Sequence, residues 1–84
     1  MKYYLRLHQQ STKKGMRPQL SAFLDKKGEA KHVSIKKNSM CFQSESGAKD
    51  WIEREAKDFK RVGAVWKWTD EDSLLAFSLE IVKA

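Results

Sequence analysis

The residues best suited to covalent chemistry are one cysteine and two histidines. Nucleophilic catalysis needs a nucleophile beside a base that a third group orients, and Cys41 with His8 or His32 is the one combination that could qualify. Nothing in their spacing brings them together, and Cys41 lies between Met40 and Phe42, where a small buried hydrophobic side chain is expected. The sequence therefore predicts no catalytic residues, and we expect the protein not to be an enzyme.

Metal and cofactor motifs are also missing from the sequence. A zinc site needs about four ligands at short spacings, and the two histidines and one cysteine are scattered over 34 positions. The acidic run from Asp70 to Asp72 lacks the oxygen ligands and the defined turn of a calcium loop, and is typical of a solvated hairpin tip. The glycines are isolated, so no glycine-rich phosphate cradle is present. We expect no metal and no cofactor.

Positive charge is concentrated in the first half of the chain. Residues 1–40 carry ten lysines and arginines against two acidic residues, a balance of +8, whereas residues 41–84 carry seven against nine, a balance of −2. Such asymmetry suggests a surface that attracts polyanions or an acidic protein patch. The alternative is that surface lysines only keep a small protein in solution.

The basic residues fall in loops and at strand ends, where lysine and arginine can contact phosphates. Aromatic side chains on the uncovered face of a sheet would add base stacking. The sequence contains no nucleic-acid-binding motif that would support these contacts further. The predicted nucleic-acid-binding residues are Arg6, Lys13, Lys14, Arg17, Lys26, Lys27, Lys36 and Lys37, with Tyr4 and Phe23 as the stacking aromatics.

Length and composition predict one folded domain that spans residues 1–84. A single cysteine excludes an internal disulfide framework, which favours an intracellular protein. The first ten residues alternate rather than form an apolar run, so they do not resemble a secretory signal. No stretch reaches the roughly 20 apolar residues of a membrane span. We expect a cytoplasmic protein that is complete as written and has no membrane partner.

Hydrophobic periodicity predicts five strands and one helix. The helix should begin at an N-cap of Ser44 or Ser46, carry an apolar stripe from Ala48 to Val62, and end at Gly63. A short further strand at residues 40–42 is left open. Gly28 should provide a positive φ in the turn that follows the second strand. The predicted strands are residues 3–9, 19–25, 29–37, 64–69 and 75–81.

These elements define an α+β fold with two layers. The order is β-β-β-α-β-β, with a mostly antiparallel sheet of about five strands and the helix packed on one face. The opposite face should be open to solvent, since one helix can cover only one face. It is expected to carry Tyr4, Arg6, His8, Ser21, Phe23, His32, Lys36, Val65 and Lys67.

Two functions are consistent with this pattern. The first is a small nucleic-acid-binding protein that uses the basic N-terminal strands and loops to bind DNA or RNA. The second is a protein-interaction module or inhibitor, for example a phage or mobile-element accessory protein, that binds an acidic protein surface. Pairing through a sheet edge would also allow a homodimer.

Overall fold

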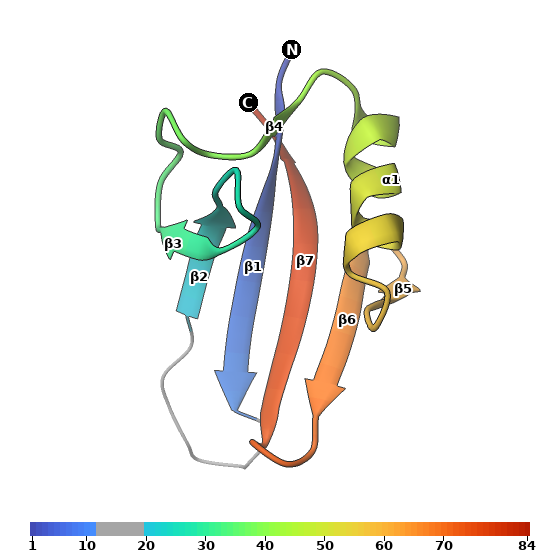
Figure 1. The fold of residues 1–84 in the computed structure, drawn as a ribbon. Helices are drawn as coiled ribbons and strands as arrows, with labels where there is room; N and C mark the ends of the chain where they lie inside the picture. Colours follow the sequence, from blue (N-terminus) through green and yellow to red (C-terminus); the bar gives the residue numbers. More distant parts are fainter. Residues whose placement is uncertain (12–19) are drawn as a thin grey trace.

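The computed structural model describes residues 1–11 and 20–84 of the chain. One helix lies against one face of an antiparallel sheet, which confirms the predicted α+β class (Figure 1). The sheet has seven strands rather than about five, because two short strands flank the helix. The elements are β1 (Tyr3–Ser11), β2 (Leu20–Leu24), β3 (Ala30–His32), β4 (Cys41–Phe42), α1 (Glu45–Glu55), β5 (Lys60–Val62), β6 (Val65–Asp70) and β7 (Leu75–Lys83).

The first and last strands form the centre of the sheet. The strand order is β3-β2-β1-β7-β6-β5, and β4 pairs with the beginning of β1 beyond the end of β2. β1 and β7 pair along their whole length, from Tyr3 opposite Lys83 to Ser11 opposite Leu75. The two chain ends therefore lie side by side, as Figure 1 shows.

The helix begins where the sequence predicts. Ser44 is the N-cap, and its hydroxyl oxygen accepts a hydrogen bond from the backbone N–H of Gly47 (3.1 Å). This bond satisfies one of the N–H groups that the first turn of a helix leaves unpaired. Glu45 in the first turn adds a favourable interaction with the positive end of the helix dipole.

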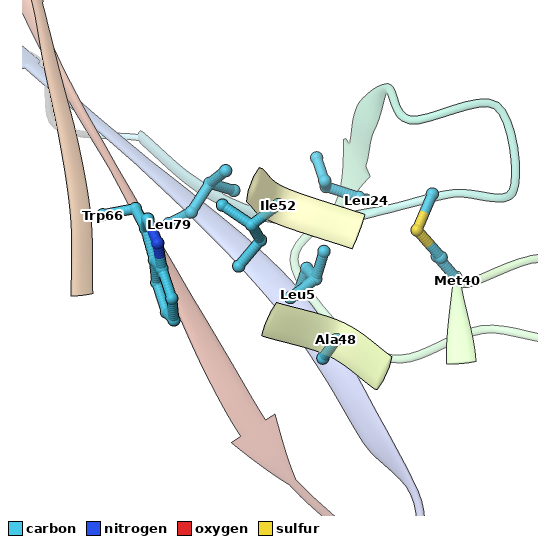
Figure 2. Packing of buried hydrophobic residues seen from close by; sticks show 7 residues of the cluster. All are labelled: Leu5, Leu24, Met40, Ala48, Ile52, Trp66 and Leu79. Carbon is cyan, nitrogen blue, oxygen red and sulfur yellow. The ribbon is translucent and has the colours of Figure 1, made fainter. Parts of the chain in front are cut away.

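The core lies between α1 and one face of the sheet. Ile52 and Leu5 are fully buried, and Ile52 extends from the helix toward the central strands (Figure 2). The alternation predicted for β1, β6 and β7 is confirmed, since the inward positions of all three strands contribute to this core. Its buried members are Leu5, Leu24, Met40, Ala48, Ile52, Trp66 and Leu79.

The helix ends earlier than predicted, because the chain turns back into the sheet after Ala56. The backbone of Ala56 is not helical (φ −112°, ψ 57°), and the N–H of Phe59 donates to the carbonyl of Ala56 in a turn (3.0 Å). Residues 60–62 then form β5, which pairs with β6. The predicted helix end at Gly63 is wrong.

Gly63 instead makes the turn between β5 and β6. Val62 and Val65 are paired, so the connection contains two residues, and Gly63 has φ +66°. A positive φ at the first of two central residues is the requirement of a type II′ hairpin turn, which matches the twist of the flanking strands.

The predicted third strand, residues 29–37, is correct only in its first half. β3 stops at His32, and the chain turns away from the sheet until β4. A strand over residues 29–37 with His32 and Lys36 on the open face would turn Val33 and Ile35 inward. Val33 is 84% exposed and Ile35 37% exposed, so that expectation is wrong. By contrast, Gly28 has φ +84°, as predicted for the turn between β2 and β3.

Candidate functional site

Two turns of the basic half of the chain lie side by side at one edge of the sheet. The backbone N–H of Lys26 donates to the carbonyl of Asn38 (2.9 Å), and Asp25 pairs with Ser39 as an isolated antiparallel bridge. The exposed lysines of both turns therefore belong to one surface. We call this surface the lysine corner, and its members are Lys26, Lys27, Lys36 and Lys37.

Asp25 holds the first of these turns in place. Its carboxylate oxygen Oδ1 accepts hydrogen bonds from the backbone N–H groups of Lys27 (2.9 Å) and Glu29 (3.0 Å). The bond from Glu29 lowers the pKa of Asp25 below its ordinary value; burial opposes this effect, while the bond from Lys27 and the charge of Lys31 add to it. A charged, bonded Asp25 thus keeps the side chains of Lys26 and Lys27 on the outside of the turn.

Ser39 holds the second turn. Its Oγ accepts a hydrogen bond from the backbone N–H of Lys36 (2.8 Å), and its own N–H donates to the carbonyl of Lys36 (3.0 Å). Ser39 is buried at 4% exposure, whereas Lys36 and Lys37 are exposed. The hydrogen bonds of Ser39 therefore fix the backbone of this turn, and the side chains of Lys36 and Lys37 are exposed on it.

The acidic residues of this segment, Asp25 and Glu29, form salt bridges with Lys31, which is not part of the lysine corner. Lys31 Nζ lies 3.3 Å from Glu29 Oε2 and 3.8 Å from Asp25 Oδ2. In the part of the chain that the structure describes, none of the four lysines of the corner forms a salt bridge. The charges of Lys26, Lys36 and Lys37 are thus available to an external anion, whereas the charge of Lys27 also interacts with Asp25.

The first turn of the lysine corner lies on the helix side of the sheet rather than on the open face. A Cβ atom placed on Gly28 would lie 3.5 Å from Cζ2 of Trp51 in α1, so the first turn rests against the helix. The charged residues that line the hollow between them are Glu55, Lys57 and Asp58.

The face of the sheet opposite α1 carries most of the residues predicted for it. Residues directly opposite each other in paired strands share a face, and the observed pairing joins Arg6 to Phe23 and Glu80, and His8 to Ser21 and Ser78. We call this side of the sheet the open face. Of the nine residues predicted there, Lys36 alone is not on a strand, and the others are Tyr4, Arg6, His8, Ser21, Phe23, His32, Val65 and Lys67.

Arg6 is not a free cation on this face. Its guanidinium forms an ion pair with Oε1 of Glu80, to which its Nε also donates (2.6 Å). His8 Nε2 contacts the same oxygen (2.7 Å), and Nδ1 of His8 lies 2.6 Å from Oγ of Ser21. The proposed phosphate contact from Arg6 is thereby weakened, since Glu80 already neutralises its charge.

The order serine, histidine, carboxylate invites comparison with hydrolytic triads. In neutral His8 the Nε2–H donates to Glu80, which leaves Nδ1 to accept from the hydroxyl of Ser21. The two ring nitrogens are used the other way round from the usual triad, and Arg6 shares the carboxylate oxygen. Cross-strand polar pairing accounts for the arrangement. This network was not predicted from the sequence, although Glu80 has the strand parity that places it on the same face as Arg6.

Substitution of Glu80 by glutamine tests this network. Burial raises the pKa of Glu80, but hydrogen bonds from His8 and Arg6 outweigh burial and hold the pKa below its ordinary value of 4.5. Because the pKa is lower in the folded state, the stabilisation is complete above the ordinary pKa and is lost as pH falls through the folded value. We expect Glu80→Gln to cost about 1–2 kcal/mol of unfolding free energy at pH 7.

Urea unfolding at pH 7 and at pH 3 measures this effect. The difference between wild type and Glu80→Gln should shrink as pH falls below the ordinary pKa of 4.5 and through the lowered folded-state value. Glu53 is exposed on the helix, so Glu53→Gln is the matched control and should change stability by less than about 0.5 kcal/mol. Equal losses at both pH values would argue against a charged Glu80 as the centre of the network.

The rings of the predicted stacking platform, Tyr4 and Phe23, pack against each other. Phe23 is 6% exposed, because Tyr4, Arg6 and His32 surround it on the open face. The Tyr4 ring meets it edge to face at 6.4 Å, and the Arg6 guanidinium lies 5.7 Å from its centroid. Burial of Phe23 leaves little ring surface for a base, while Tyr4 is half-buried. Base stacking by these two residues stays a prediction.

Cys41 is exposed, so the prediction that it is buried is wrong. It pairs with Tyr4 at the start of β1, which places it on the open face rather than in the core. Burial raises the pKa of Tyr4, and a hydrogen bond and charge interaction with Cys41 raise it further. In the described residues Cys41 Sγ donates to the carbonyl of Phe42 (4.0 Å), and no side chain there orients the pair as catalysis would require.

Lys13, Lys14 and Arg17 lie outside the described residues. Within the described ranges, no group of three or more histidine, cysteine or acidic residues could hold a metal ion. No helix in these ranges is both long and apolar enough to cross a membrane.

The fold defines a two-layer α+β protein with an open sheet face. Comparison with known protein families, with curated proteins and with solved structures gave no match.

Proposed function

We propose that the protein binds nucleic acid through phosphate contacts made by the lysine corner. The observation that carries this proposal is the junction of two turns, fixed by the Asp25 and Ser39 bridge, which brings four exposed lysines to one surface. Lysine contributes a point charge to phosphate binding and does not read base sequence. Affinity should therefore come from electrostatics and counterion release.

The aromatic residues argue for backbone contacts rather than base stacking. Stacking platforms need exposed rings, and Phe23 is buried while Arg6 is paired with Glu80. The proposed protein thus binds nucleic acid with little sequence preference. It does so in the cytoplasm, where nucleic acid is present.

Fluorescence anisotropy tests the proposal. The labelled probes are oligonucleotides of about 20 nucleotides, both DNA and RNA, in single- and double-stranded form. We expect binding at 50 mM salt, with similar affinity for two unrelated sequences. If the four lysines neutralise four phosphates, affinity for duplex DNA should fall roughly 100-fold between 50 and 200 mM salt.

The alternative partner is an acidic protein surface, which the same four charges would attract. An absence of oligonucleotide binding at 50 mM salt would contradict the nucleic-acid proposal and leave this partner class in its place. Sequence-dependent binding that survives high salt would contradict the phosphate-based mechanism.

A further inference from the structure

Two lysines on the open face lie directly opposite each other. Lys60 in β5 is the cross-strand partner of Lys67 in β6, and both are exposed. Like charges in this position repel each other and destabilise the pairing of their strands. Among the described residues neither lysine forms a salt bridge, so no ion pair there offsets their repulsion.

The pair begins a polar row that continues across the sheet. Lys67 lies opposite Ser78 in β7, Ser78 lies opposite His8 in β1, and His8 lies opposite Ser21 in β2. The row therefore contains two ammonium groups, two hydroxyls and one imidazole, and the imidazole contacts the carboxylate of Glu80 beside the row. Lys60, Lys67 and Ser78 can donate hydrogen bonds to an oxyanion, whereas His8 and Ser21 are bonded to Glu80 and to each other.

Two hollows adjoin the row and share Lys67 and Thr69. One has a volume of about 310 Å³ and reaches His8 and Ser78, and the other has a volume of about 410 Å³ and reaches Lys60. Lys67 lies between them, with the hydroxyl of Thr69 on the same face two residues along the strand. Each hollow is large enough for a phosphate group but not for a folded partner.

We propose that the row from Lys60 to His8 is a binding site for a phosphate-type oxyanion, with Lys60 and Lys67 as the charged ligands and Ser78 and Thr69 as neutral donors. An anion between the lysines would replace their repulsion by two attractions. The site lies on the open face and does not depend on the lysine corner. Asp58 also lines the hollow at Lys60 and opposes the anion there.

Lys67→Gln removes one of the two ammonium groups that face each other. Without phosphate, this variant should melt at a higher temperature than the wild type at low ionic strength, because the like-charge repulsion is gone. Inorganic pyrophosphate at about ten times its Kd should raise the melting temperature of the wild type by roughly 6–11 °C. The same pyrophosphate should leave the Lys67→Gln protein unchanged.

Thermal melts of four proteins, with sodium chloride matched for ionic strength, carry the test. Lys49→Gln removes a charge from the helix and should keep the full pyrophosphate shift, and Asp58→Asn should enlarge it. A shift that chloride reproduces, or that persists in Lys67→Gln, would overturn the proposal. So would a lower melting temperature of Lys67→Gln without phosphate.

The source of the phosphate follows from a second measurement on the same proteins. If the natural ligand is a free phosphate compound, Lys67→Gln should bind oligonucleotides as the wild type does. If the row holds backbone phosphates of nucleic acid, Lys67→Gln should bind duplex DNA more weakly, and pyrophosphate should compete with the oligonucleotide. Both results support the oxyanion site, and the melts alone decide whether it exists.

Discussion

Replacement of Ile52 by alanine is expected to lower the unfolding free energy by about 3–4 kcal/mol. Ile52 is fully buried and lies where α1 meets the central strands (Figure 2). The substitution removes apolar contacts and leaves a cavity, because a close-packed core relaxes only in part. A protein of this size should lose about 15–25 °C in melting temperature, which calorimetry or circular dichroism would measure.

Val62 provides the matched control for this prediction. The sequence places Val62 on the same helix stripe as Ile52, whereas the structure places it in β5 with 53% exposure. Val62→Ala should therefore cost less than about 0.5 kcal/mol. Comparable losses in Ile52→Ala and Val62→Ala would mean that the helix continues to Gly63, and the described fold of residues 56–65 would be wrong.

Removal of the lysine corner is expected to reduce nucleic-acid affinity by about 100- to 1000-fold at 0.1 M salt, if all four lysines contact phosphate. The variant replaces each of the four lysines by glutamine. Its fold should be retained, because Asp25 and Ser39 hold both turns through backbone groups of the neighbouring residues. Anisotropy measures the affinity, and a melting curve checks the fold.

A control must separate the effect of net charge on affinity from the effect of where the charges lie. A control variant removes four positive charges from the opposite half of the chain, so both variants fall from a formal charge of +6 to +2. The control should keep affinity within about tenfold of the wild type, as expected for charges outside the contact surface. Its substitutions are Lys49→Gln, Arg54→Gln, Lys57→Gln and Lys83→Gln.

Local sequence patterns predicted the central strands of the sheet and the first residue of the helix. Alternation placed Leu5, Trp66 and Leu79 on the inward face because a strand has a period of two, and Ser44 marked the N-cap through its own side chain. The same local rules failed after Ala56, where helix and strand patterns overlap. A stripe that includes Phe59 and Val62 fits a helix face, but pairing with β6 decided in favour of a strand.

The candidate site depended more on long-range contacts. Each lysine pair of the corner was visible in the sequence, but their adjacency results from the bridge between Asp25 and Ser39. The opposition of Lys60 and Lys67 could not be foreseen while Lys60 was assigned to a helix. Burial of Phe23 likewise follows from neighbours on β1 and β3, which the order of strands determines.

The dependence of affinity on salt, measured for the wild type and the lysine-corner variant, tests the central claim most directly. A plot of log Kd against log salt concentration counts the phosphates that a protein neutralises on duplex DNA, at about 0.9 per contact. The two slopes should differ by about 3.6. Equal slopes would show that these four lysines make no phosphate contact, and the proposed interface would be wrong.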